Sequence, residues 1–150
     1  MTKAPLPTID DMRVAVIGLG YVGLPLAVEF GKQRPTLGFD VNATRVREVQ
    51  AGLDSTGEID DLAAAIHLTA TTDLSDIAAC NVFIVAVPTP IDSHRQPNLA
   101  PLLAASRTVG EVIKRGDIVI FESTVYPGAT EEDCLPLVEH ISGLSVNTDF

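Results

Sequence analysis

The sequence predicts an α/β protein built on a doubly wound parallel sheet, with helices on both faces and therefore three layers. Three observations lead to this fold class. Short apolar runs alternate with stretches of helical periodicity along the chain. The clearest run shows no alternation with polar residues, as expected for a strand buried on both faces. A glycine-rich turn joins the first apolar run to the first helical stretch. Such alternation favours a parallel sheet with right-handed crossovers.

Five strands are predicted, and they differ in how clearly the sequence marks them. The first leads directly into the glycines, and the fourth is an apolar run that ends at Pro88 and Pro90. The third is the weakest, because residues 52–72 show little periodicity. In chain order, the predicted strands are residues 13–17, 35–40, 67–71, 81–90 and 116–124.

Helices are predicted between these strands. In the first one, Pro25 falls in the opening turns, where its missing N–H does least harm. Asn42 can cap the second helix, and Gly52 stops it. The last helix has three acidic residues in its first turn, the charge that a helix N-terminus favours. The predicted helices are residues 21–32, 43–50, 58–66, 73–80, 99–114 and 127–140.

Length and composition indicate one domain without a membrane span. The chain has 150 residues, of which 46% are hydrophobic, and no apolar run approaches the length of about 18 that a membrane helix needs. Residues 1–12 lack the apolar middle of a secretory signal, so we expect a cytoplasmic protein. The net charge of −10 argues against a nucleic-acid partner.

The cysteines and histidines do not indicate a metal site. Cys80 and Cys134 lie far apart in the sequence, and the three histidines form no close cluster. We therefore expect no metal. Both cysteines are predicted to be reduced, buried and small apolar residues.

The three glycines of the first turn form the pattern G-x-G-x-x-G. Between a strand and a helix, this pattern is typical of Rossmann-type dinucleotide binding. Gly18 would permit the tight turn, Gly20 would let a pyrophosphate approach the backbone, and Gly23 would let the helix pack closely on the strand. Backbone N–H groups at the helix start supply the donors for phosphate. The pattern alone also occurs by chance and in FAD enzymes.

Asp40 ends the second predicted strand, about 20 residues after the first glycine. An acid at this position can accept hydrogen bonds from the ribose hydroxyls of an adenosine, and it would repel a 2′-phosphate. We therefore expect NAD as the cofactor, not NADP. The alternative is a solvated residue at the end of a strand.

Several longer motifs resemble the UDP-glucose/GDP-mannose dehydrogenase family, and in particular its bacterial UDP-N-acetylhexosamine 6-dehydrogenases. The motifs are "GLGYVGLPLAVEFGK", "GFDVNATRV", "VPTPID", "QPNLAPL" and "ESTVYPGATEE". The resemblance implies an NAD-binding domain at residues 13–150 after an N-terminal tail at residues 1–12. It also implies oxidation of the C6 alcohol of a UDP-N-acetylhexosamine to a carboxylate. Two NAD and a cysteine thioester serve this reaction, in a homodimer that works in surface polysaccharide synthesis.

The resemblance also implies roles for single residues. Asp40 and Arg45 look like the pair that binds the adenosine ribose. Thr89 of "VPTP" resembles a threonine that lines the cofactor site, and Thr124 of "ESTVYPG" resembles a threonine that positions a water beside the nicotinamide. Thr124 is thus the candidate catalytic residue. The pyrophosphate turn resembles that of the family at Gly18, Leu19, Gly20, Tyr21, Val22 and Gly23.

These roles have alternatives. Arg45 could lie on a solvated helix face, Thr89 could simply end a strand in a proline turn, and Thr124 could cap the following helix. Tyr126 departs from the family's "STVP" pattern, because it stands between Val125 and Pro127.

The family's sixth strand, its "SPE" motif and its substrate domain with the catalytic cysteine have no counterpart in this sequence. The resemblance therefore leads us to expect a cofactor domain truncated near the sixth strand and inactive on its own. A free-standing module that senses NAD is a second possible function. A β-hydroxyacid dehydrogenase is a third, although it does not account for "VPTP" and "ESTVYPG".

Overall fold

Five parallel strands form one sheet in the order β3-β2-β1-β4-β5 in the computed structural model, which describes residues 2–150. The central strand β1 pairs with both β2 and β4, so that Val14 lies opposite Thr36 on one side and Val82 on the other. This topology confirms the predicted doubly wound sheet. Each strand lies within its predicted range: β1 Val14–Ile17, β2 Thr36–Phe39, β3 Leu68–Thr71, β4 Val82–Val85 and β5 Ile118–Phe121.

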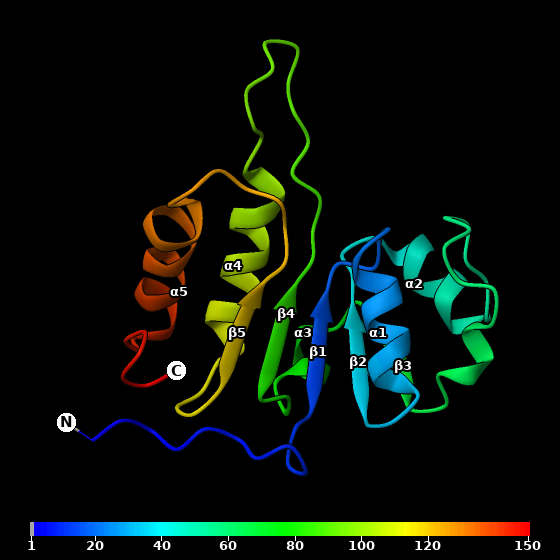
Figure 1. Cartoon of the computed structure of the whole chain (residues 1–150), viewed down its shortest axis with the longest axis horizontal. Helices are drawn as coiled ribbons and strands as arrows, with labels where there is room; N and C mark the ends of the chain where they lie inside the picture. Colours follow the sequence, from blue (N-terminus) through cyan, green and yellow to red (C-terminus); the bar gives the residue numbers. More distant parts are fainter. Residues whose placement is uncertain (1) are drawn as a thin grey trace.

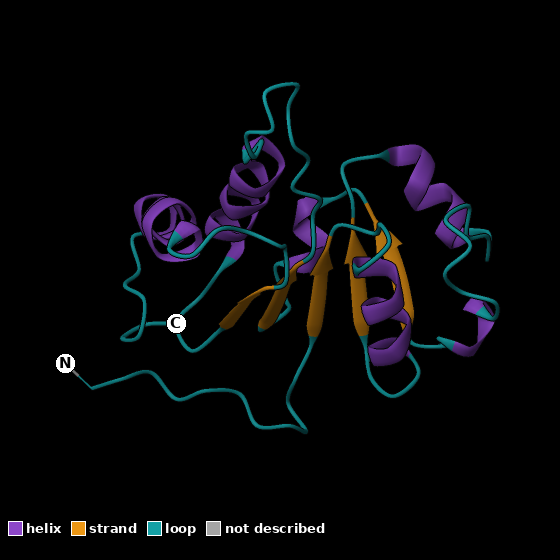
Figure 2. Cartoon of the chain, turned by 45° about the horizontal axis from the view of Figure 1, so that its top comes forward, coloured by secondary structure: helices purple, strands orange, loops and turns teal. Residues whose placement is uncertain are grey.

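Helices cover both faces of the sheet and complete three layers (Figures 1 and 2). One face carries the first two helices, which contact β1, β2 and β3, and the other face carries the last three. The helices are α1 Gly23–Gly31, α2 Ala43–Gln50, α3 Leu74–Ile77, α4 Ala100–Val112 and α5 Leu135–Ser142. The chain winds from β1 to β3 in one direction and returns to β4, which places the switch point between β1 and β4.

The hydrophobic core is divided in two by the sheet. Side chains of β1 alternate between the two halves: Val14 and Val16 pack under α1 and α2, whereas Ala15 and Ile17 pack under α3, α4 and α5. All four side chains are at most 2% exposed. The apolar runs of β1 and β4 therefore correspond to strands buried on both faces, as predicted, whereas the run of β5 at the edge of the sheet is only partly buried.

The structure corrects three predicted helices. Residues 58–66 contain only a short 3₁₀ turn, Leu62–Ala64. The first helix begins at Gly23, because Tyr21 and Val22 belong to the preceding turn. The last helical segment begins with a π-helical turn, Thr130–Cys134, which leads into α5. It cannot start at Pro127 because Gly128 adopts a φ of 94°, outside the range of a right-handed helix.

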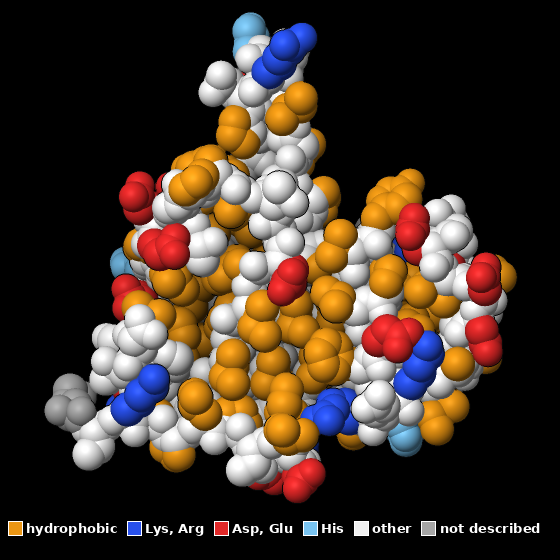
Figure 3. Space-filling view, in the orientation of Figure 1, with side chains coloured by type: hydrophobic (Ala, Val, Ile, Leu, Met, Phe, Trp, Pro, Cys, Tyr) orange, Lys and Arg blue, Asp and Glu red, His pale blue; other side chains and the backbone are white. Residues whose placement is uncertain are grey.

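The segment between β4 and α4 projects from the sheet as an arm (Figure 1). Ile91 and Pro97 form an isolated antiparallel bridge within it, and residues 90–98 are exposed. Figure 3 shows basic side chains, coloured as Lys or Arg, and a His side chain at its tip. Among residues 2–150, no helix is both long and apolar enough to cross a membrane.

Candidate functional site

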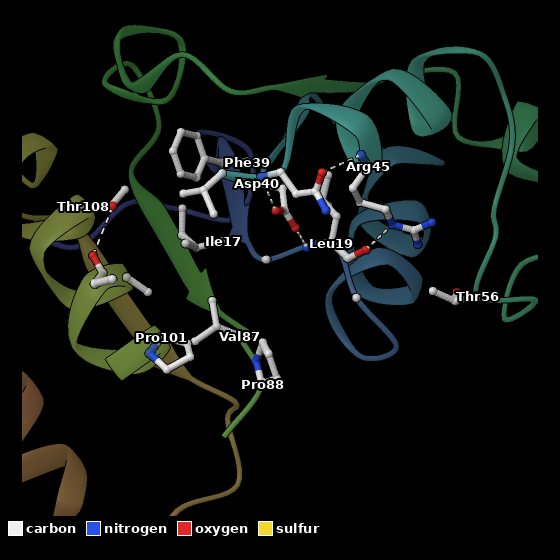
Figure 4. Close-up of a pocket in the computed structure, with 16 residues that line it drawn as sticks. Ile17, Leu19, Phe39, Asp40, Arg45, Thr56, Val87, Pro88, Pro101 and Thr108 are labelled. Carbon is white, nitrogen blue, oxygen red and sulfur yellow. Dashed lines mark hydrogen bonds between the residues drawn. The ribbon is translucent and has the colours of Figure 1, made fainter. Parts of the chain in front are cut away.

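A cavity of about 420 Å³ lies at the carboxyl ends of β1, β2 and β4, next to the switch point of the sheet. Residues from four loops and from the helices α2 and α4 form its wall (Figure 4). The glycine turn follows β1, the segment 40–42 follows β2, and Val87 and Pro88 follow β4. Its size is within the range of about 300–1,000 Å³ that is usual for ligand sites. The sheet therefore brings together segments that are far apart in the sequence.

Leu19, the residue between the first two glycines, is fixed on three sides. Its side chain is fully buried and packs against Gly38 of β2, where an added Cβ would come within 2.7 Å of a Leu19 methyl carbon. Its N–H donates to Oδ2 of Asp40 at 2.8 Å, and its carbonyl oxygen accepts from Nε of Arg45 at 2.6 Å. The glycine turn is thus held by two side chains from β2 and α2 as well as by the core.

The N–H groups that follow Leu19 are available to a ligand. Those of Gly20, Tyr21 and Val22 donate no hydrogen bond to any other residue in the described range 2–150. They precede α1, whose N-terminus also carries the positive end of the helix dipole. This arrangement of free donors suits a phosphate or pyrophosphate and needs no lysine.

The three glycines are required for different reasons. Gly18 adopts a φ of 96°, which favours glycine. Gly23 lies so close to the turn that an added Cβ would overlap the carbonyl oxygen of Gly18. Gly20, in contrast, has no atom within 4 Å of an added Cβ. Packing within the chain does not explain Gly20, which lines the cavity, so its missing side chain fits a bound pyrophosphate that approaches the backbone.

Asp40 and Arg45 lie together at the edge of the cavity, as the sequence predicted, but both are also engaged with the protein itself. The second oxygen of Asp40 accepts from the N–H of Asn42 at 2.8 Å. Arg45 is only 7% exposed. The two alternatives, a merely solvated Asp40 and a solvated helix face for Arg45, are therefore wrong.

Arg45 also forms a buried ion pair with Asp54, at 2.8 Å. Burial opposes the charge of Asp54, but hydrogen bonds from Thr56, Arg45 and the backbone N–H of Ile59 outweigh it and hold the pKa of this carboxyl well below its usual range. Glu48 lies 3.2 Å from the same guanidinium. Asp54 is therefore charged at neutral pH.

Thr89 and Thr124 meet beyond the ends of β4 and β5. The hydroxyl of Thr89 donates to the carbonyl oxygen of Thr124 at 2.6 Å. The hydroxyl of Ser123 donates in turn to the carbonyl oxygen of Val87. Neither threonine lines the cavity itself, and neither do Tyr21, Val22 or Gly23. The cap of the following helical segment is Ala129, without a side-chain hydrogen bond, so the capping alternative for Thr124 is wrong.

Sequence analysis missed one side of the cavity. This side is a face of α4 with residues at helical spacing, together with two residues that follow β4 and one residue of the segment between α2 and β3. Small side chains on α4 leave room for a ligand, and their spacing in "PLLAASRT" is the signal that could have indicated this face. The missed residues include Thr56, Val87, Pro88, Pro101, Ala104, Ala105 and Thr108.

Both cysteines are reduced and buried, as predicted. Burial raises the pKa of Cys80 to about 11, and burial also raises the pKa of Cys134. Neither thiol is therefore set up as a thiolate nucleophile. Within residues 2–150, no group of three or more His, Cys, Asp or Glu side chains is arranged to hold a metal ion.

The doubly wound sheet, the glycine turn with its free N–H groups and the acid at the end of β2 define a dinucleotide-binding domain of the Rossmann type. Comparisons with known proteins agree. A model described as "UDP-glucose/GDP-mannose dehydrogenase family, NAD binding domain" matches residues 12–150. This chain belongs to that family, and its cofactor is NAD. The match decides against the β-hydroxyacid dehydrogenase alternative.

Individual relatives are similar over most of this chain. UDP-N-acetyl-D-glucosamine 6-dehydrogenase of Pseudomonas aeruginosa is 61% identical over 144 residues, and that of Salmonella typhi is 53% identical. Each alignment covers 95% of this chain and 34% of the relative. The solved UDP-D-ManNAc dehydrogenase of Pyrococcus horikoshii superposes with a TM-score of 0.86 at 38% identity, over 93% of this chain and 34% of that one. The chain thus spans about a third of the relatives that it matches.

Proposed function

We propose that this chain is the NAD-binding domain of an enzyme that oxidises the C6 alcohol of a UDP-N-acetylhexosamine to a carboxylate, for surface polysaccharide synthesis. The observation that carries the proposal is the 61% identity to UDP-N-acetyl-D-glucosamine 6-dehydrogenase of Pseudomonas aeruginosa. Oxidation of an alcohol to a carboxylate removes four electrons, so two molecules of NAD each accept one hydride.

The proposal assigns the residues of the cavity to parts of the cofactor. The glycine turn binds the pyrophosphate through the free N–H groups after Leu19. Asp40 accepts hydrogen bonds from the hydroxyls of the adenosine ribose. Each of its carboxylate oxygens already accepts from one backbone N–H and can accept a further hydrogen bond. Arg45 stabilises this end by fixing the carbonyl of Leu19.

At the other end of the cofactor, we assign Thr89 and Thr124 to the nicotinamide side. Both lie at the carboxyl edge of the sheet, where ligands of open α/β sheets bind. Thr89 holds the backbone of Thr124 and thereby sets where the Thr124 hydroxyl stands. This hydroxyl orients a water or the reacting oxygen, which makes Thr124 the candidate catalytic residue in the complete enzyme.

The proposal extends to the setting of the complete enzyme. Residues 13–150 form the NAD-binding domain and residues 1–12 a tail. The enzyme acts in the cytoplasm as a homodimer, and its substrate is a small nucleotide sugar. We expect no nucleic-acid partner and no anionic membrane partner, because the net charge of −10 would repel both.

The test is to express the complete reading frame and to follow NADH production with UDP-N-acetylglucosamine, UDP-N-acetylgalactosamine and UDP-glucose. We expect two NADH for each N-acetylhexosamine that is consumed, and faster turnover than with UDP-glucose. If the expressed protein binds NAD but oxidises none of these sugars, the result would support the NAD-sensing module and overturn the proposal.

A further inference from the structure

The segment between α2 and β3 folds around one carboxylate, that of Asp54. The side chain of Asp54 is only 1% exposed although it belongs to a loop. It accepts five hydrogen bonds at 2.7 to 3.0 Å. The donors are the guanidinium of Arg45, the N–H and hydroxyl of Thr56, and the N–H groups of Glu58 and Ile59. A single side chain therefore organises the turn formed by residues 54–59.

Asp54 is linked to the glycine turn through Arg45. The guanidinium of Arg45 uses Nη2 for Asp54 and Nε for the carbonyl oxygen of Leu19. These two bonds fix the plane of the guanidinium, and Nη1 adds bonds to Glu48 and Ser55. Asp54 is the closer of the two carboxylates that pair with Arg45, at 2.8 Å against 3.2 Å for Glu48. Removing its charge would leave the nearly buried guanidinium with a weaker ion pair and release Nη2, so the orientation of Arg45 would be less well fixed.

Asp54 is linked to the cavity a second time through Thr56. Thr56 lines the cavity, and Figure 4 shows Arg45 between Leu19 and the segment that carries Thr56. The Thr56 hydroxyl donates its proton to Asp54 at 2.7 Å. Its oxygen therefore keeps acceptor capacity for a hydroxyl of a ligand.

We propose that Asp54 is a positioning residue of the NAD site, which holds Arg45 behind the glycine turn and Thr56 in the cavity wall. Asp54 does not touch the cofactor itself. The inference rests on NAD binding and on the placement of the adenosine ribose at Asp40. It does not depend on which sugar the complete enzyme oxidises, so the two ideas can fail separately.

The main test is Asp54→Asn in this chain, with NAD and AMP affinities measured by calorimetry well below the melting temperature. The amide keeps the size of the side chain, but it loses the charge and turns an N–H₂ toward other donors. We expect binding of both NAD and AMP to weaken about tenfold, since both contain the adenosine ribose. Unchanged affinities in the folded variant would overturn the proposal.

Asp73→Asn is the matched control. Asp73 also organises a turn, because its carboxylate accepts from the N–H and the hydroxyl of Ser75, but it does not line the cavity. We expect this variant to keep its NAD affinity and to lose little stability, because Asn caps helices about as well as Asp. If it weakened NAD binding as much as Asp54→Asn, the effect would reflect stability in general and the proposal would be wrong.

Two further variants test how Asp54 acts. Arg45→Lys keeps the charge but cannot bond to Leu19 and Asp54 with the same geometry. If Asp54 acts through Arg45, the two substitutions should not add up. The double variant Asp54→Asn/Arg45→Lys should then have about the same NAD affinity as the single variant with the lower NAD affinity. Fully additive losses of binding free energy would overturn this link.

Thr56→Val tests the second link to the cavity. This variant retains the ion pair between Arg45 and Asp54, so it can be measured even if Asp54→Asn does not fold. We expect it to weaken NAD binding about threefold; unchanged binding would remove Thr56 from the proposal.

Discussion

The hydroxyl of Thr89 donates a hydrogen bond of 2.6 Å to the carbonyl oxygen of Thr124 and so joins the segment after β4 to the segment after β5. The bond ends on the backbone of Thr124, not on its side chain. The side chain of Thr124 can therefore be changed without breaking this link, which separates its chemistry from its structural role.

Thr124→Ala in the complete enzyme should lower turnover by about 10² or more, because the variant loses the hydroxyl to which we assign the orientation of a water or the reacting oxygen. NAD affinity should stay within a fewfold, since the adenosine end is untouched, and the melting temperature should change little. Thr89→Val is the control for the backbone link, and it should lose about 1 kcal/mol of stability. Normal turnover in Thr124→Ala would contradict the catalytic assignment.

Alanine at Gly20 and at Gly23 should have opposite effects. Gly20→Ala places a methyl group in open space beside the cavity, so the free energy of unfolding should stay within about 1 kcal/mol while NAD affinity falls. Gly23→Ala forces its Cβ onto the carbonyl of Gly18, so stability should fall by about 1–3 kcal/mol. Thermal unfolding and NAD titration of both variants check this. A stable Gly20→Ala variant with full NAD affinity would count against the pyrophosphate assignment.

The chain should bind NAD in preference to NADP, because a 2′-phosphate would meet the carboxylate of Asp40. Calorimetry with both cofactors measures this preference. Asp40→Ser should reduce the preference for NAD over NADP, because the negative charge that repels the 2′-phosphate is removed. It should also lower stability, because Ser cannot replace both bonds to the N–H groups of Leu19 and Asn42. Equal affinities of the unaltered chain for the two cofactors would remove Asp40 from this role.

Acid should destabilise the chain partly through Asp54. The pKa of Asp54 in the folded state lies well below its usual range, whereas in the unfolded chain it is about 3.9. Between the two values the unfolded state binds more protons, so the free energy of unfolding falls as the pH falls below about 4. Denaturant unfolding at pH 7 and pH 3 should show a smaller loss for Asp54→Asn than for the unaltered chain. Equal losses would mean that Asp54 does not contribute.

Residues 1–150 alone should produce no NADH with any UDP-N-acetylhexosamine. The thioester route needs an accessible thiolate, whereas both thiols here are buried with raised pKa values. A thiol reagent at pH 8 should accordingly label Cys80 and Cys134 slowly in the folded chain and quickly in denaturant. Steady NADH production by the purified chain would show that a nucleophile within it had been overlooked.

Much of the fold could be predicted because its signals are local. The strands β1, β4 and β5 are apolar runs. The cap at Asn42 depends only on neighbouring residues: its side chain accepts from the N–H groups of Thr44 and Arg45. The error at residues 127–130 has an equally local cause, the positive φ of Gly128. Periodicity alone does not reveal such a turn when the flanking residues favour a helix.

Residues of the site could be predicted only where a residue type at a given place in the fold has one usual role, such as glycine in the turn between a strand and a helix. The glycine turn and Asp40 satisfied this condition. Thr56 did not, because its position in the cavity depends on the hydrogen bonds that its N–H and hydroxyl donate to Asp54, which no sequence pattern encodes. The partners of Arg45 were missed for the same reason, since a helix that starts at Ala43 does not reveal which loop will cover it.

The three-sided fixation of Leu19 has a consequence for how NAD binds. A glycine turn in isolation has many conformations, and ordering it during binding would oppose association. Here the buried side chain and two hydrogen bonds order the turn when the chain folds. The loss of conformational entropy therefore belongs to folding and not to binding, so the glycine turn and its free N–H groups are already ordered before the cofactor arrives.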